Sequence, residues 1–192
     1  MQHIDERQLE DDLQYRYRFL CQFIGFEPSD AEAIHAAAPH LGPLVMSIVE
    51  RTYDKLLAFD ATARHFLPPQ SGFDGPAASN LAELSAQAAP IQFRKEHLSR
   101  YLLQLLGRSY EDAKFPVYLD MVGKIHTPLA GNAQIQVPLV QMNALMGWLA
   151  DILSEAISEL GLPSAETVRT LRAFQKLLWI QNDFINRHYT RG

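Results

Sequence analysis

The stretch Tyr118-Leu119-Asp120-Met121-Val122-Gly123-Lys124-Ile125-His126 is the most informative part of the sequence. Leu119 and Val122 lie seven and four residues before His126, so the histidine continues the apolar stripe of a helix and is expected to project toward the core. A buried imidazole needs partners for both ring nitrogens, and the carbonyl of Val122 is within reach of Nδ1. Nε2 is then left facing the interior. By spacing alone, this arrangement fits a metal ligand and a hydrogen-bonded core histidine equally well.

Helical spacing of apolar residues extends outward from this stretch in both directions. Strand signals are weak, because the sequence has few alternating Val, Ile and Thr runs and no Asn-Gly or Asp-Gly turn between apolar segments. We therefore predict an all-α fold. The expected helices cover residues about 8–25, a short Ala-rich segment after Pro28, 41–58, 90–107, 114–127, 137–160 and 164–189.

Small polar residues, glycines and prolines mark the expected helix ends. Gly25 is predicted to stop the first helix. Ser29 is predicted to cap the next helix, with Glu32 completing a capping box, and Ser164 to cap the last helix. A cluster of prolines and glycines predicts a long loop over about 67–89.

Length and composition limit the class of protein. The 192 residues are expected to form one domain, 1–192, because a chain of this length can bury a sizeable core. The net charge is -5, and basic residues are scattered beside acidic ones, which argues against a nucleic-acid partner. The single cysteine, Cys21, excludes an intrachain disulfide. Neither a signal peptide nor an apolar run of membrane-spanning length is visible, so we expect a cytoplasmic protein without a membrane partner.

Common catalytic motifs are absent from the sequence, which leaves few candidate functional residues besides His126. Tyr53 lies four residues after Val49 and three before Leu56, on the expected buried side of its helix. A buried phenol also needs a partner, and the simplest explanation is a core tyrosine bonded to a backbone carbonyl. Phe66, taken alone, fits a core aromatic residue.

Three phrases together resemble the protoglobin and globin-coupled-sensor family: Tyr53-Asp54-Lys55-Leu56-Leu57-Ala58-Phe59, Ala63-Arg64-His65-Phe66 and the stretch from Tyr118 to His126. The resemblance covers about residues 10–190. It implies a globin-like fold with an extra N-terminal helix, here about 8–25, a long loop at about 67–89 before the distal helix, and haem b as the cofactor.

The resemblance also implies roles for individual residues. His126 matches the proximal iron ligand, Tyr53 the distal tyrosine and Phe66 the phenylalanine that packs on the haem. The distal helix around Leu98 has no motif, so Arg94, Lys95, Leu98 and Ser99 all remain candidates to face the iron, and His97 is a less favoured sixth ligand. Thr52 stands where protoglobins tend to carry an aromatic residue, which implies a more open or more polar distal wall. The remaining residues expected at the haem are Val122, Val137 and Val140.

The implied function is reversible binding of O₂, CO or NO for sensing, storage or scavenging. The alternatives are a haem enzyme that acts on NO, nitrite or peroxide, supplied by a separate reductase, and a cofactor-free helical interaction module. The last two helices carry more apolar residues than one stripe needs, so a homodimer through these helices is expected. A sensing role would require this dimer or a separate signalling partner.

Overall fold

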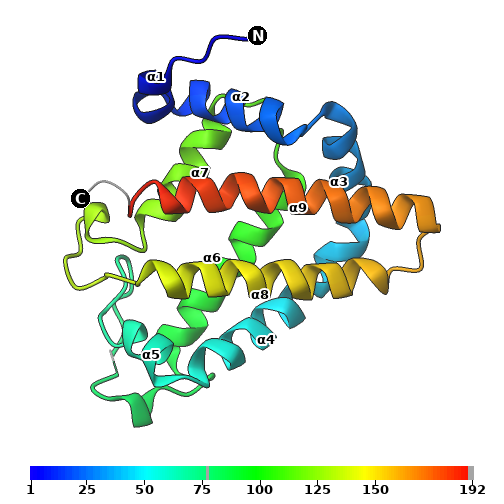
Figure 1. The fold of residues 1–192 in the computed structure, drawn as a ribbon. Helices are drawn as coiled ribbons and strands as arrows, with labels where there is room; N and C mark the ends of the chain where they lie inside the picture. Colours follow the sequence, from blue (N-terminus) through cyan, green and yellow to red (C-terminus); the bar gives the residue numbers. More distant parts are fainter. Residues whose placement is uncertain (77, 190–192) are drawn as a thin grey trace.

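The computed structural model describes residues 1–76 and 78–189, and over these residues the protein is all-helical, which confirms the predicted fold class. Figure 1 shows the arrangement of the helices. In chain order the α-helices are α1 (Glu6–Asp11), α2 (Leu13–Ile24), α3 (Pro28–Leu41), α4 (Val45–Leu57), α5 (Asp60–Ala63), α6 (Ala89–Gly107), α7 (Lys114–Lys124), α8 (Leu139–Ser158) and α9 (Ser164–Asn186). Short 3₁₀ turns are η1 (Gly42–Leu44), η2 (Arg64–Phe66), η3 (Leu81–Glu83) and η4 (Pro128–Ala130).

The N-terminal segment forms two helices rather than the single helix expected over 8–25. Asp12 adopts an extended conformation, with φ -118° and ψ 108°, and thereby ends α1. Its carboxylate accepts hydrogen bonds from the backbone N–H groups of Gln14 and Tyr15, which caps α2. Gly25 ends α2 in the left-handed region at φ 74°, as predicted.

The predicted caps of α3 and α9 are wrong, because a proline at the start of each helix shifts the cap position away from the predicted serine. Pro28 occupies the first turn of α3, where its missing N–H costs nothing, so the cap position falls on Glu27 and not on Ser29. The backbone N–H of Glu27 donates to the carboxylate of Asp30 at 2.8 Å. Ser164 is already inside α9, whose cap position is Pro163.

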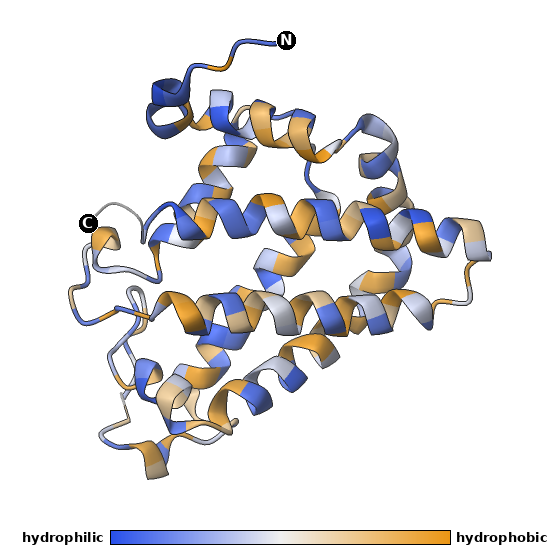
Figure 2. Ribbon diagram, in the orientation of Figure 1, coloured by the Kyte–Doolittle hydropathy of each residue, from blue (hydrophilic) through white to orange (hydrophobic). Residues whose placement is uncertain are grey.

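α8 and α9 run alongside each other, and α6 and α7 cross behind them (Figure 1). α9 packs against α3, α7 and α8, and α6 packs against α4. Figure 2 shows hydrophobic and hydrophilic residues on different sides of the long helices, as expected for helices that bury one stripe. The centre of the core is fully enclosed, with Ile34, Val49, Ile91, Phe115, Ile157, Leu177 and Phe184 at 0% exposure.

A loop of about twenty residues separates η2 from α6, in agreement with the loop expected over about 67–89. Arg94, near the start of α6, donates from Nη2 to the carbonyl of Pro68 at 2.8 Å. Asn132 donates from Nδ2 to the carbonyl of Pro69 at 3.2 Å. The first part of the loop is therefore tied both to α6 and to the segment that follows His126. Among the described residues, no helix is long and apolar enough to span a membrane.

Candidate functional site

His126 lies two residues beyond the observed end of α7, which stops at Lys124 rather than at the expected Thr127. The ring Nδ1 donates to the carbonyl of Val122 at 2.8 Å, as predicted from the four-residue spacing. The backbone of His126 is also fixed, because its N–H donates to Gly123 at 3.3 Å and its carbonyl accepts from Val137 at 3.0 Å. Nε2 makes no hydrogen bond to any described residue. The imidazole is thus held rigidly with one nitrogen open.

The surroundings of His126 favour its neutral form. Desolvation lowers the pKa of the ring, and the positive charge of Arg94 acts in the same direction, although the bond to Val122 opposes both. With the proton on Nδ1, the neutral ring carries its lone pair on Nε2. A neutral imidazole with an oriented Nδ1–H and an open Nε2 is the form that ligates metals.

Gly123 explains why the end of α7 can lie directly on α9. A Cβ at this position would be 2.5 Å from the carbonyl oxygen of Phe184 and 2.9 Å from the Cα of Ile185. Both are backbone atoms of α9, so any larger residue would push the helices apart. The glycine three residues before His126 therefore sets the depth at which the imidazole is held.

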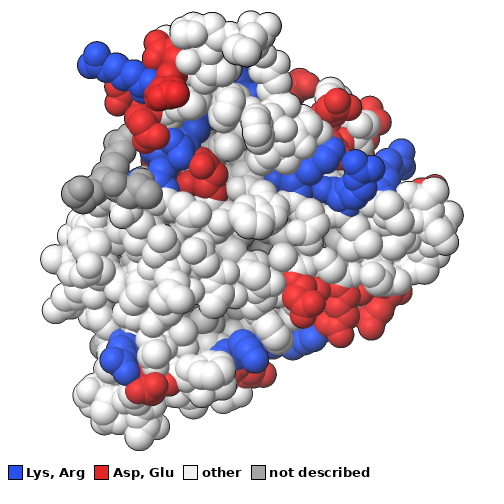
Figure 3. Space-filling view, in the orientation of Figure 1, with Lys and Arg blue, Asp and Glu red and all other residues white. Residues whose placement is uncertain are grey.

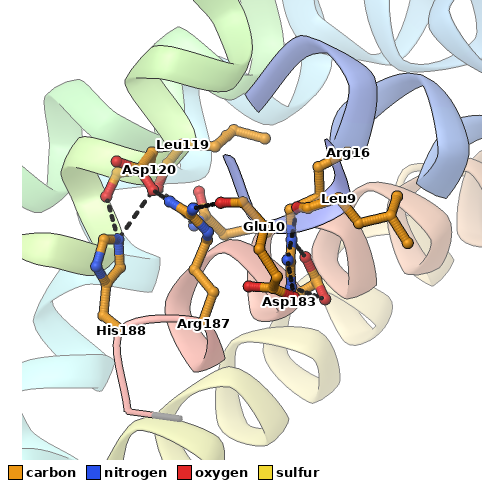
Figure 4. A network of polar contacts seen from close by, with 9 residues as sticks. Leu9, Glu10, Arg16, Leu119, Asp120, Asp183, Arg187 and His188 are labelled. Carbon is orange, nitrogen blue, oxygen red and sulfur yellow. Dashed lines mark hydrogen bonds and ion pairs between the residues drawn. The ribbon is translucent and has the colours of Figure 1, made fainter. Parts of the chain in front are cut away.

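A network of ion pairs fixes α7 and α9 further along (Figure 4). Asp120 of α7 forms an ion pair with Arg187 at the end of α9. The Nε2 of His188, one residue further on, lies 3.0 Å from Oδ1 of Asp120. Arg187 also donates from Nη2 to the carbonyl of Glu10 at 2.9 Å, which ties in α1. The helix that carries the imidazole is thus anchored at two places.

The N-terminal helices are bound to α9 by a second buried pair in the same view (Figure 4). Arg16 of α2 donates to both carboxylate oxygens of Asp183, from Nε at 2.5 Å and from Nη2 at 2.9 Å. Its Nη1 donates to the carbonyl of Leu9 at 3.1 Å. Two-pronged pairs of this kind fix orientation as well as distance. The extra N-terminal helices are therefore integral to the fold that supports His126.

Tyr53, Phe66 and Arg94 form a second cluster of functional groups. The rings of Tyr53 and Phe66 are 5.6 Å apart, and the guanidinium of Arg94 lies 5.2 Å from the centre of the Phe66 ring. Tyr53 is buried, but no described residue makes a hydrogen bond with its hydroxyl. By contrast, the buried hydroxyls of Tyr101 and Tyr110 donate to Gln181 and to the carbonyl of Leu105. The simple explanation of Tyr53 as a core tyrosine bonded to a carbonyl is therefore wrong.

Arg94 links this cluster to His126. Its charge acts on both groups: it lowers the pKa of His126 and opposes the rise that burial imposes on the pKa of Tyr53. The structure thus brings together Tyr53 and Phe66, two residues expected at the site from the sequence, and adds Arg94, whose charge also acts on His126.

The candidate residues on the distal helix, α6, differ in the residues that they contact. Lys95 forms an ion pair with Glu50 of α4, and Ser99 donates to the sulfur of Met46 at 3.3 Å, so both side chains are turned toward α4. Leu98 is four residues after Arg94, on the same face of α6, and packs against the core.

His97 is turned in another direction. Its Nδ1 donates to the carbonyl of Phe93 at 2.8 Å, and its ring lies 4.4 Å from that of Phe93. The structure therefore supplies the ring with partners of its own and does not place it beside Tyr53.

The remaining expected residues are divided between the site and the surface. Val122 supplies the carbonyl for His126, and Val137 donates to the carbonyl of His126 and packs against the core. Val140 is 74% exposed and is not part of the cluster. Thr52 is buried and donates to the carbonyl of Ile48 at 2.7 Å, so its hydroxyl is used within α4 and does not make the site more polar.

The donor set limits which metal centre can form here. Across the described residues, no group of three or more His, Cys, Asp or Glu side chains is placed to hold a metal ion. A single histidine with an open Nε2 can hold a metal only when a cofactor supplies the other donors, as the porphyrin of haem does. The single imidazole, the unbonded phenol and the aromatic ring of Phe66 fit such a cofactor.

The fold places the protein in the globin class, as a comparison with solved structures shows. The globin domain of the Geobacter sulfurreducens globin-coupled sensor superposes with a TM-score of 0.71, covering 91% of this chain and 97% of that chain at 18% sequence identity. At the level of sequence, the chain matches the Protoglobin family over residues 13–192 and belongs to this family. The protein is thus a globin-type gas-binding protein. Among curated proteins, no sequence matches the chain.

Proposed function

We propose that the protein is a b-type haem protein that reversibly binds a diatomic gas, O₂, CO or NO, through a single globin domain formed by residues 1–192. His126 is the protein ligand of the iron in this proposal. The observation that carries it is the neutral, oriented imidazole with an open Nε2. Tyr53, a buried tyrosine whose hydroxyl has no bond to the described residues, supports it. When bound, the haem supplies the iron that takes up the gas.

The residues of the chain have separate tasks in this function. Val122 holds the imidazole in one orientation, while Gly123 and Asp120 fix the helix that carries it. Phe66 offers an aromatic face for the cofactor. Tyr53 supplies a hydrogen-bond donor on the ligand side. A donor in a low-dielectric environment stabilises a polar ligand more than an apolar one, so the site favours O₂ over CO.

A homodimer through α8 and α9 forms part of the proposal. Figure 3 shows a broad uncharged area over the first half of α8 and the adjoining part of α9. Three large apolar side chains on these helices are exposed, Val140 at 74%, Val168 at 55% and Trp179 at 64%. Exposed apolar surface of this kind is typical of protein interfaces. A two-fold dimer would cover the same surface on both subunits.

The function is tested by adding hemin to the purified protein and recording the visible spectrum. We expect a Soret band that saturates at one haem per chain, and a shifted band when the reduced protein is exposed to CO. A protein that gives no Soret band would be a cofactor-free interaction module. A protein that binds haem and turns over NO, nitrite or peroxide with a supplied reductant would be a haem enzyme instead of a gas carrier or sensor.

A further inference from the structure

Arg94 is a half-buried cation whose described contacts include no carboxylate. Four other poorly exposed cations in the described part of the chain each pair with an acid: Arg16 with Asp183, Lys95 with Glu50, Lys176 with Asp30, and Arg187 with Asp120. Arg94 makes one hydrogen bond, from Nη2 to the carbonyl of Pro68 at 2.8 Å. Its Nε is buried and makes no hydrogen bond to any residue that the structure describes.

A half-buried charge without a counter-ion and with a buried, unbonded N–H group costs free energy, so its presence requires an explanation. The Phe66 ring, 5.2 Å from the guanidinium, offers a cation–π contact, but this contact leaves the in-plane N–H donors free. Burial accordingly lowers the pKa of Arg94, and the neighbouring phenol of Tyr53 opposes that change. A planar guanidinium with unused donors is suited to a small anion.

We propose that Arg94 and Tyr53 together form an anion-binding pair on the distal side of the haem, which binds small anionic ligands of ferric iron such as fluoride, azide and nitrite. The inference rests on the proposed haem function and adds a ligand class to it. The positions of the residues select the distal side. The Phe66 ring lies 5.6 Å from the Tyr53 ring and 5.2 Å from the Arg94 guanidinium, and the charge of Arg94 acts on the pKa of both Tyr53 and His126.

Arg94 has a second possible anionic partner, a propionate carboxylate of the haem itself. A propionate at Arg94 would satisfy the same donors without contacting an incoming ligand. The two sources make different predictions, because a propionate contact strengthens haem retention while a distal contact strengthens anion binding. The test therefore measures both quantities on the same variants.

The experiment titrates the ferric, haem-loaded protein with fluoride, azide and the neutral ligand imidazole at constant pH and ionic strength. Wild type is compared with Arg94→Gln, which removes the charge, and Arg94→Lys, which keeps it. The matched control is Arg100→Gln, because Arg100 is exposed on the same helix. The rate of haem transfer to an excess of apomyoglobin is measured for each protein.

We expect Arg94→Gln to raise the Kd for fluoride and azide by about tenfold or more, the loss expected for one charge-assisted hydrogen bond. Imidazole affinity and haem transfer should stay within about twofold, as should all values for Arg100→Gln, because exposed charges contribute little. Arg94→Lys should fall between wild type and Arg94→Gln. Unchanged imidazole binding also shows that a variant is folded.

Two results would overturn the proposal while leaving the haem function intact. Unchanged anion affinity with faster haem transfer would assign Arg94 to a haem propionate, and no change in either quantity would make it a structural residue that holds the loop at Pro68. A wild-type protein that takes up no haem would refute the proposed function, and the inference with it.

Discussion

The backbone carbonyl of Phe184 lies where a side chain at position 123 would begin, 2.5 Å from the place of a Cβ on Gly123. Contacts this short with backbone atoms force the helices to move. We therefore expect Gly123→Ala to lower the free energy of unfolding by about 1–2 kcal/mol, because the overpacking exceeds the gain in helix propensity. Urea unfolding of the cofactor-free protein measures this change, and haem transfer should become faster because the displaced helix carries His126.

Gly147 provides the matched control for this substitution. It lies inside α8, and a Cβ there would meet no atom within 4 Å. Gly147→Ala should raise the free energy of unfolding by up to about 1 kcal/mol through helix propensity alone. Equal effects of the two substitutions would show that the α7–α9 contact is not as close as described.

Tyr53→Phe isolates the contribution of the unbonded hydroxyl. The substitution keeps the ring that lies 5.6 Å from Phe66 and removes one donor. A hydrogen bond of about 1–2 kcal/mol to a polar ligand corresponds to roughly tenfold faster O₂ dissociation. CO dissociation should remain nearly unchanged. Stopped-flow measurements that found equal acceleration for both gases would indicate a steric role for the tyrosine.

The proposed dimer is tested by placing a charge on its surface. Wild type should be a dimer by light scattering at micromolar concentration, and Trp179→Glu should shift it to monomer, because a carboxylate in an apolar interface is costly to desolvate. Phe23→Glu is the control, since Phe23 is also a large aromatic residue and is 80% exposed but lies on α2. A monomeric wild type, or dissociation by both variants, would contradict the assigned surface.

His188 makes the stability of the cofactor-free protein depend on pH. Burial lowers the pKa of this ring in the folded state, although Asp120 opposes the change. The unfolded chain therefore takes up the proton first as pH falls below about 6.5, so its contribution to stability is present above that pH and is lost below it, by at most about 1.4 kcal/mol per pH unit.

Urea unfolding between about pH 7.5 and 5.5 tests this dependence. His188→Gln should reduce the loss of stability on acidification. His40→Gln is the control, because His40 is exposed at the end of α3. A pH dependence that is identical in wild type and His188→Gln would show that this ring does not titrate differently in the two states.

Local rules predicted the parts of the site that lie within one turn of helix. The bond from His126 to Val122 follows from four-residue spacing, and the buried position of Tyr53 follows from the same periodicity. The helix ends were less predictable where a proline precedes or begins a helix. Pro28 moves the cap of α3 from the predicted Ser29 to Glu27, although the preference of proline for the first turn of a helix could have been applied to the sequence.

Relationships between distant segments were beyond reach of the sequence. The α7–α9 contact depends on Gly123 meeting Phe184, some sixty positions later, and no local pattern indicates that pairing. Arg94 was one of four candidates on the distal helix. Lys95 and Ser99 are distinguished from it only by their partners on α4, which the sequence does not reveal. Its one available signal was the four-residue spacing to Leu98, which places both on one face.

The assignment of His126 as the iron ligand is tested directly by one comparison: the Soret spectrum of wild type and of His126→Gly, each with hemin, without and with added imidazole. We predict that wild type gives a saturable Soret band and that His126→Gly retains haem poorly. Free imidazole should restore the band by replacing the missing ligand. A His126→Gly protein with the wild-type spectrum and haem affinity in the absence of imidazole would contradict the assignment.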